Sequence, residues 1–336
     1  MNQALLVSFK ITEFCKLTVE VIRIIYQKEN KLIQVDKKYT FSGHKDCVYS
    51  LEKGPGEQQF FSGAGDGMVV GWDIAQPDEG KLVARLKNSV YALRYLPEQD
   101  ILLVGHNFEG LHLIKVAEAK EIASLKCTDA NIFDIQVYQD KAWVACGNGE
   151  LLLIDLPSVT VLERIQATEK AARTIAISAK NQEVAVGFSD HQVRIFDLHT
   201  HELKHTLEGH SSSVFSVVYS PDESCLLTTG RDAQIKVWKS EDAYRMVKNI
   251  PAHMYAINSL AFDPSGDYFA SASMDKSIKL WRYSDFRLLK VLDKSRHAGH
   301  ATSVNKLIWL TPSEELISGS DDRNISIWNI NFNEKS

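Results

Sequence analysis

A histidine, a hydroxyl residue and an aspartate recur together in this chain, and they are the residue types of a hydrolytic Ser-His-Asp triad. His44 is followed by Ser62, by Asp66 at 22 residues from the histidine, and by Trp72 six residues later. The same types return at the same spacing in three further sets, which are His210, Thr228, Asp232 and Trp238; His253, Ser271, Asp275 and Trp281; and His300, Ser318, Asp322 and Trp328. An enzyme needs its catalytic site once, so four copies indicate a repeated structural unit. We call each set a tetrad.

A second repeat runs along the whole chain, including the parts without a tetrad. Val48–Leu51 is echoed at steps of 40 to 47 residues by Val90–Leu93, Ile132–Ile135, Thr174–Ile177, Val214–Val217, Ile257–Leu260 and Val304–Leu307. The sequence therefore contains seven units, three of them without the tetrad. Each unit reads as short strands between turns, with no long helical period, which excludes folds of alternating strands and helices.

The unit that runs from Gly43-His44 to Trp72-Asp73 resembles a WD40 repeat, and the resemblance extends over residues 31–330. Three units depart from the pattern, since Phe196-Asp197, Ile154-Asp155 and Ile114-Lys115 stand where the family has Trp-Asp. The resemblance implies an all-β fold, a seven-bladed β-propeller with four-stranded antiparallel blades. It also implies that each tetrad is a structural network in which the Trp N–H, hydroxyl, His ring and Asp carboxylate bond in series.

The ends of the chain predict how the ring closes. Few residues follow the strand expected at Ile325–Ile330, whereas Lys31–Phe41 reads as a strand that leads into Gly43-His44. We therefore expect Lys31–Phe41 to be the outer strand of the blade that holds Trp328. The predicted divisions are an N-terminal extension over 1–30, one propeller over 31–331 and a tail over 332–336. The extension fits a strand or a helix, as a surface appendage or a partner-binding segment.

Composition and motifs narrow the possible functions. The net charge is −5, and no polybasic tail, secretory signal or membrane-spanning segment stands out. We therefore expect a cytoplasmic protein that binds neither nucleic acid nor membranes and that is monomeric when alone. The five cysteines form no C-x-x-C pair, which fits a reducing compartment. Neither a phosphate-binding loop nor a zinc-protease motif occurs, so no cofactor or metal is expected. A local run of histidines, His191, His199, His201 and His205, reads as a solvated loop.

The resemblance implies that partners bind the face that carries the Asp turns. Two positions in each unit are expected there. The residue before the first-strand Val is assigned as Cys47, Ser89, Asn131, Arg173, Ser213, Ala256 and Ser303. The residue before the turn Asp is assigned as Gly65, Asn107, Gly147, Ser189, Arg231, Met274 and Asp321.

Aromatic and basic residues add to this face. The residue after the first-strand Val is Tyr49, Tyr91, Phe133 or Phe215 in four units, where rings either line the channel mouth or pack between blades. The longest connection between units contains Lys294, Arg296 and His297, which with Arg173 and Arg231 form either a basic rim or an ordinary solvated loop. Arg and aromatic residues are common interface anchors.

These observations predict a non-enzymatic scaffold that presents a rigid face to a protein or peptide partner. One alternative is a propeller that binds a small ligand, or acts as an enzyme, at the channel mouth. A third reading is a ubiquitin-ligase substrate receptor, which Trp72-Asp-Ile-Ala75 and Trp281-Arg-Tyr-Ser284 disfavour because they lack the W-D-x-R pattern frequent in such proteins.

Overall fold

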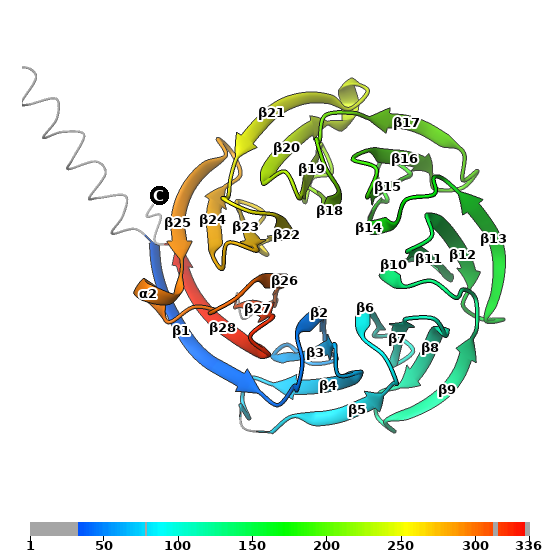
Figure 1. Cartoon of the computed structure of the whole chain (residues 1–336), viewed down its shortest axis with the longest axis horizontal. Helices are drawn as coiled ribbons and strands as arrows, with labels where there is room; N and C mark the ends of the chain where they lie inside the picture. Colours follow the sequence, from blue (N-terminus) through cyan, green and yellow to red (C-terminus); the bar gives the residue numbers. More distant parts are fainter. Residues whose placement is uncertain (1–32, 78, 312–314, 333–336) are drawn as a thin grey trace, which may run out of the picture.

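The computed structural model describes residues 33–77, 79–311 and 315–332. These residues form seven four-stranded antiparallel sheets that surround a central axis as the blades of a propeller (Figure 1). The predicted seven-bladed all-β fold is thereby confirmed. The N-terminal extension expected over 1–30 lies outside the described residues.

Each blade is a meander whose first strand lies nearest the axis in Figure 1. Blade 1 consists of β2 (Val48–Lys53), β3 (Gln59–Ala64), β4 (Met68–Asp73) and β5 (Lys81–Arg85). Blade 2 consists of β6 (Val90–Leu96), β7 (Ile101–His106), β8 (Gly110–Lys115) and β9 (Lys120–Leu125). Blade 3 consists of β10 (Ile132–Tyr138), β11 (Lys141–Cys146), β12 (Glu150–Asp155) and β13 (Thr160–Gln166). Blade 4 consists of β14 (Ala172–Ser178), β15 (Glu183–Phe188), β16 (Val193–Asp197) and β17 (Leu203–Leu207). Blade 5 consists of β18 (Val214–Tyr219), β19 (Cys225–Gly230), β20 (Gln234–Lys239) and β21 (Arg245–Pro251), with the short 3₁₀ helix η1 (Ser240–Asp242) before β21. Blade 6 consists of β22 (Ile257–Phe262), β23 (Tyr268–Ser273), β24 (Ile278–Arg282) and β25 (Arg287–Leu292), and the short helix α2 (Lys294–His297) follows it. Blade 7 consists of β26 (Val304–Trp309), β27 (Leu316–Ser320), β28 (Asn324–Phe332) and β1 (Ile33–Ser42).

Burial follows the position of a strand in its blade. The second strands are buried on both faces, as in β15 and β23, because each blade packs between two neighbours. The outer strands are mostly exposed, as in β9 and β21. The core consequently lies between blades. One cluster joins Trp72 and Phe60 of blade 1 to Ile317 of blade 7.

Side chains near the axis also join neighbouring blades. The backbone N–H of Ile175 donates to Asp134 Oδ2 at 2.8 Å, and that of Val217 donates to Thr174 Oγ1 at 3.3 Å. Ser216 and Ser259 accept in the same way from the first strands of the next blades. Hydrogen bonds between neighbouring blades therefore connect the first strands around the axis.

The ring closes through the N-terminal strand, as predicted. β1 pairs antiparallel with β28 from Ile33↔Phe332 to Ser42↔Asn324, so it is the outer strand of the blade that holds Trp328. The described strand extends one residue beyond the expected Phe41. The Phe41 ring then packs edge-on against Trp72 of the first blade at 5.4 Å. β1 therefore gives blade 7 its fourth strand and covers the edge of β28, which would otherwise be unpaired.

A β-bulge interrupts the pairing of the first and second strand in every blade. The register shifts between Val48 and Ser50, and at the equivalent point in the other six blades. In blade 4 the shift lies between Ala172 and Thr174. Ala172 is thus the counterpart of Val48, and the predicted alignment of Thr174–Ile177 with Val48–Leu51 is wrong by two residues.

Candidate functional site

The bulges place one residue from each blade near the start of its first strand, which is the strand closest to the propeller axis (Figure 1). A bulged residue is left out of the ladder, and its side chain is re-aimed relative to its neighbours. We call these seven residues the collar, and they are Tyr49, Tyr91, Phe133, Arg173, Phe215, Asn258 and Asn305. All seven are partly buried. The collar lies where the first strands begin, on the face of the tetrad turns, because backbone N–H groups of those turns, such as Gly65 and Asp321, donate to carbonyls just before the bulges.

Five collar residues form a continuous arc of rings and one cation. The Tyr49 and Tyr91 ring centroids are 4.7 Å apart, and those of Tyr91 and Phe133 are 5.5 Å apart. The Arg173 guanidinium carbon lies 4.2 Å from the Phe133 centroid and 5.6 Å from that of Phe215. The sequence left open whether these four aromatic residues line the channel mouth or pack between blades, and here they contact one another or Arg173 across blades.

Arg173 occupies a different position from the one expected. The sequence alignment put it before the first-strand Val, but Ala171 holds that place, since the Ser189 N–H donates to the Ala171 carbonyl at 2.9 Å. Arg173 takes the aromatic position instead. Its Nε donates to Ser189 Oγ at 3.0 Å. Its two terminal amino groups form no hydrogen bond with any described residue. Burial lowers the pKa of this guanidinium, which indicates that its hydration is incomplete.

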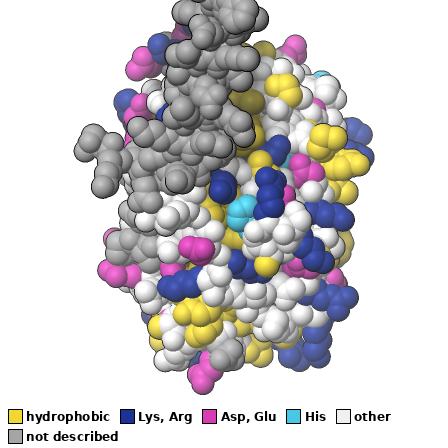
Figure 2. All heavy atoms as spheres, turned by 90° about the vertical axis from the view of Figure 1, so that its left-hand side faces the viewer, with side chains coloured by type: hydrophobic (Ala, Val, Ile, Leu, Met, Phe, Trp, Pro, Cys, Tyr) yellow, Lys and Arg dark blue, Asp and Glu magenta, His cyan; other side chains and the backbone are white. Residues whose placement is uncertain are grey.

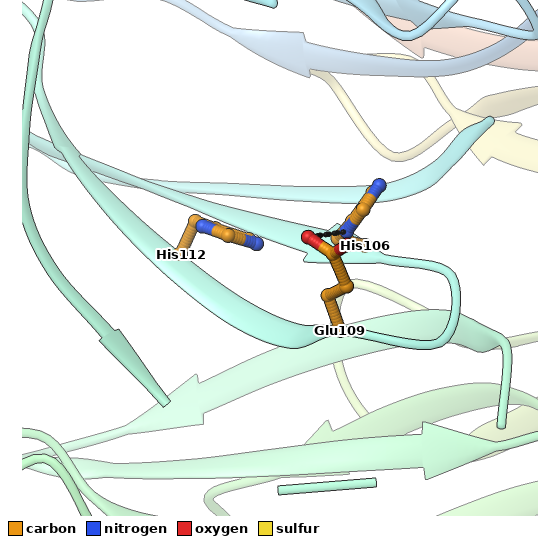
Figure 3. Close-up of side chains that lie close together, drawn as sticks. All are labelled: His106, Glu109 and His112. Atoms are coloured by element: carbon orange, nitrogen blue, oxygen red, sulfur yellow. Dashed lines mark ion pairs between the residues drawn. The ribbon is translucent and has the colours of Figure 1, made fainter. Parts of the chain in front are cut away.

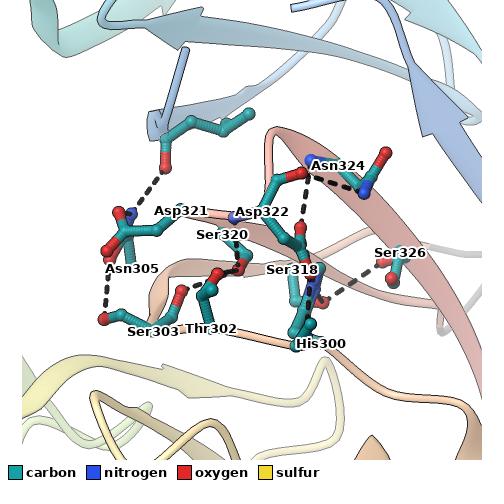
Figure 4. Close-up of polar contacts among 12 residues, drawn as sticks. His300, Thr302, Ser303, Asn305, Ser318, Ser320, Asp321, Asp322, Asn324 and Ser326 are labelled. Atoms are coloured by element: carbon teal, nitrogen blue, oxygen red, sulfur yellow. Dashed lines mark hydrogen bonds and ion pairs between the residues drawn. The ribbon is translucent and has the colours of Figure 1, made fainter.

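The remaining part of the collar is polar. Asn258 Nδ2 donates to Ser303 Oγ at 3.0 Å and to the Val304 carbonyl at 2.9 Å. Asn305 Nδ2 donates to Asp321 Oδ1 at 2.7 Å and to the Val48 carbonyl at 3.0 Å (Figure 4). Asp321 was expected on this face, whereas neither asparagine was singled out from the sequence.

The other predicted partner residues differ in where they lie. Arg231 and Met274 are exposed, with Met274 57% exposed, in the same turn position as Asp321. Arg231 is connected to Arg173 by short steps, since its N–H donates to the Ser213 carbonyl and the Ser213 hydroxyl donates to the Ser189 carbonyl. Arg231 therefore lies in a turn of the blade that follows the one holding Arg173.

The basic loop does not join the collar. Lys294, Arg296 and His297 form α2, at the outer edge of the disc beside β1 (Figure 1), where Lys37 Nζ donates to the Ala298 carbonyl at 2.9 Å. Arg296 is held by Asp293, with contacts of 2.9 and 2.6 Å to Oδ2. The basic rim of this loop with Arg173 and Arg231, one of the two readings that the sequence left open, is thus not formed. Acidic and basic side chains are interspersed on this side of the molecule (Figure 2).

The four tetrads form the same chain of hydrogen bonds in blades 1, 5, 6 and 7. In blade 1 the Trp72 Nε1–H donates to Ser62 Oγ at 2.7 Å, and His44 Nε2 lies 2.7 Å from the same oxygen. His44 Nδ1 lies 3.3 Å from the Asp66 carboxylate. The equivalent Nδ1–carboxylate distances are 2.9 Å at His210 and 2.8 Å at His253, and 3.0 Å at His300 (Figure 4). The four histidine side chains are at most 1% exposed.

Each tetrad aspartate also organises the turn around it. Asp232 accepts from the backbone N–H of Ser211 at 3.2 Å and of Gln234 at 3.3 Å. Burial alone raises the pKa of this carboxyl, but the hydrogen bond and charge of His210 and the two backbone donors outweigh burial and hold the pKa below its ordinary value. Burial lowers the pKa of His44 and of His253, against the opposing pull of Asp66 and Asp275.

No helix within the residues that the structure describes is long and apolar enough to cross a membrane.

Comparison with known proteins matches the tetrad-bearing blades to one repeat family. The family described as "WD domain, G-beta repeat" matches residues 36–73, 201–239, 244–282 and 290–329. Each match ends at or just after the Trp of one tetrad, and the first begins within the strand that closes the ring. Of the three blades without a tetrad, the matches include only β17, the outer strand of blade 4.

Relatives extend the similarity beyond those blades. Periodic tryptophan protein 2 of Saccharomyces cerevisiae is 24% identical over 59% of this chain, transducin-like enhancer protein 2 of Mus musculus is 24% identical over 58%, and a striatin homolog of Dictyostelium discoideum is 21% identical over 63%. The matched parts cover 20%, 26% and 23% of those proteins, so the chain corresponds to about a quarter of their length or less. Repeat matches, relatives and the seven-bladed architecture agree, and the chain belongs to the WD40-repeat family of β-propeller proteins.

Proposed function

We propose that this chain is a non-enzymatic interaction scaffold whose collar binds an anionic segment of a protein partner. The observation that carries the proposal is the state of Arg173. Its guanidinium is stacked between Phe133 and Phe215, and its terminal amino groups have no hydrogen-bond partner among the described residues. The forked geometry of this group matches a carboxylate or a phosphate.

Stacking makes this arginine a prepared binding group. Its side chain is already ordered, so an incoming anion does not have to immobilise a flexible chain. The partial loss of hydration, shown by the lowered pKa of Arg173, makes an anionic partner more favourable than it would be at a fully exposed arginine. Arg231 adds a second, exposed cation on a turn of the next blade, and the rings of Tyr49 and Tyr91 offer apolar surface along the collar. The collar therefore suits a peptide with an acidic group beside apolar or aromatic residues.

We assign a structural role to the tetrads rather than a catalytic one. In each tetrad the hydroxyl oxygen already contacts the Trp Nε1–H and His Nε2, and the His side chain is at most 1% exposed. A nucleophile needs access to its substrate. The four hydroxyl residues are completely buried and lack that access, although their contacts with His resemble those of a triad.

The test is binding of peptide pairs that differ only in charge. We would measure, by fluorescence anisotropy, the affinity of the full chain for arrayed acidic peptides and for the same peptides with Asn or Gln in place of Asp or Glu. Acidic peptides should bind more tightly, and Arg173→Gln should weaken that binding by about 10- to 150-fold, the loss of a charged hydrogen bond of about 1.5–3 kcal/mol. Arg231→Gln should have a smaller effect, mainly on the association rate.

Arg296→Gln is the matched control, because Arg296 is also an arginine but lies at the outer edge and is bound to Asp293. Its affinity for acidic peptides should equal that of the unmodified chain. If Arg173→Gln binds every peptide as the unmodified chain does, or if Arg296→Gln weakens binding as much, the collar is not the binding face.

A further inference from the structure

Blade 2 has lost its tetrad and contains a different polar cluster. At the spacing that holds His, Ser, Asp and Trp in other blades, blade 2 has Leu86, Val104, Phe108 and Ile114. Beside these apolar residues lie His106 at the end of β7, Glu109 in the turn and His112 in β8 (Figure 3). One ligand atom from each of the three lies within 4.8 Å of the other two. The repeat does not require this cluster.

His112 has a nitrogen prepared to bind a cation. Its Nδ1 lies 3.0 Å from Glu121 Oε2, and a carboxylate at that distance retains the ring proton on Nδ1. The lone pair of Nε2 is then free. Nε2 is buried and has no hydrogen-bond partner within the described parts of the chain. A carboxylate behind a histidine is the arrangement that orients histidine ligands in metal sites.

His106 presents a second unpaired nitrogen to the same space. Its side chain is completely buried, and its Nδ1 lies 3.4 Å from Glu109 Oε2 without forming a hydrogen bond to any described residue. The His106 and His112 rings are 5.4 Å apart and roughly perpendicular. Buried polar atoms are nearly always paired, and a bound ion is one of the few explanations when they are not.

Glu109 connects the cluster to solvent. Its side chain is 43% exposed, and it lies in the turn between β7 and β8, so an ion can enter without opening the blade. Its carboxylate contributes the negative charge that two neutral imidazoles lack. Lys87 lies 3.6 Å from Glu109 Oε1 but is 84% exposed, so it can move away when an ion binds.

We propose that His106, Glu109 and His112 bind a divalent first-row transition metal ion, for which Zn²⁺ is the probe. Two imidazoles and one carboxylate are a ligand set that Zn²⁺ uses, with solvent at the fourth position. Metal bonds of about 2.0–2.2 Å bring tetrahedral ligand atoms to about 3.5 Å from one another, so the cluster has to contract. The exposed turn at Glu109 supplies that movement. The sequence predicted no metal site, and the scaffold function proposed above does not depend on this one.

Binding has a structural consequence at Asn88. The Asn88 backbone N–H donates to His106 Nε2 at 3.2 Å, which places the ring proton on Nδ1. A metal at Nδ1 takes the place of that proton, and the ring then carries its proton on Nε2. Two N–H groups cannot face each other at this distance, so the Asn88 amide must turn away. A change at Asn88 therefore reports metal binding at His106 separately from affinity.

Calorimetric titration of the chelator-treated full chain with Zn²⁺ tests the proposal. One equivalent should bind with micromolar or tighter affinity. Glu109→Gln and Glu121→Gln should each weaken it by at least tenfold, the first by loss of a ligand and the second by loss of the group that orients His112. The Asn88 amide resonance should shift on titration. His199→Ala is the matched control, since His199 is exposed on another blade and should leave affinity unchanged.

Three results would overturn the proposal. These are the absence of saturable Zn²⁺ binding, unchanged affinity in Glu109→Gln together with Glu121→Gln, and an Asn88 resonance that does not move while Zn²⁺ binds. His112→Ala removes a ligand directly but also a buried ring. The two glutamate variants, whose side chains are 43% and 45% exposed, keep the test valid if that variant does not fold.

Discussion

Asp232→Ala should destabilise the propeller far more than its position in a surface turn suggests. Asp232 accepts from His210 Nδ1 at 2.9 Å and from the backbone N–H groups of Ser211 and Gln234. Its removal leaves a buried imidazole N–H without an acceptor, at a cost of about 1–3 kcal/mol, and loses two longer backbone bonds of about 0.5 kcal/mol each. The sum is about 3 kcal/mol of unfolding free energy. At about 2.1 cal/mol/K of unfolding entropy per residue, this lowers the Tm of a propeller of about 300 residues by about 5 °C.

The assay is urea denaturation followed by Trp fluorescence, with Asn148→Ala as the matched control. Asn148 is the counterpart of Asp232 in blade 3, but it is exposed. Among the described residues, its side chain forms hydrogen bonds only with Glu150, donating to Oε2 at 2.7 Å and accepting from the backbone N–H at 3.3 Å. Its loss should cost less than about 1 kcal/mol, as surface substitutions do. If Asp232→Ala unfolds at the same urea concentration as the unmodified chain, or loses no more than Asn148→Ala, the tetrad does not stabilise the turn.

Two further predictions concern closure and pH. Deletion of residues 1–41 should sharply lower the melting temperature or cause aggregation, since it removes nearly all of β1 and exposes the edge of β28, whereas deletion of 1–28 should be mild; equal melting of both deletions would contradict closure by β1. Stability should fall as pH drops below about 6.5, because the lowered pKa values of His44 and His253 mean that the unfolded chain binds those protons first. It should fall again below about 4, where Asp232, Asp275 and Asp322, whose folded pKa values lie below the ordinary value of 3.8, are protonated first in the unfolded chain; urea midpoints measured from pH 8 to 3 check both steps, and a midpoint that rises on acidification would refute the assignment.

The fold and the ring closure could be predicted from the sequence because both follow from spacing. A tetrad repeated at fixed intervals defines the blade. Few residues follow the strand expected at Ile325–Ile330, so the outer strand of that blade was expected from the N-terminal part of the propeller. The error at Arg173 arose because blade 4 has Ala172 where every other blade has Val or Ile. Only the position of the bulge between Ala172 and Thr174 shows which residue enters the collar.

Two other features depend on local geometry that spacing does not reveal. Asp293 caps α2 by accepting from the Arg296 N–H, and this folds the basic segment against β1 instead of extending it toward the channel. The blade 2 cluster spans a hairpin, so His106 and His112 match no helical or loop motif for metal binding. The apolar residues at the four tetrad positions of that blade are the signal that could have directed attention there.

The pairing of β1 with β28 also determines the order in which this protein can be completed on the ribosome. Ser42 and Asn324 pair although about 280 residues of chain separate them, so β1 leaves the ribosome long before its partner exists. At about 5–20 residues per second, that wait is about 14–56 s. During it Val35, Tyr39 and Phe41 have no blade to pack against, and the backbone of β1 has no ladder. β1 is therefore the last of the described strands to be paired, because its partner β28 is the last of them to be synthesised.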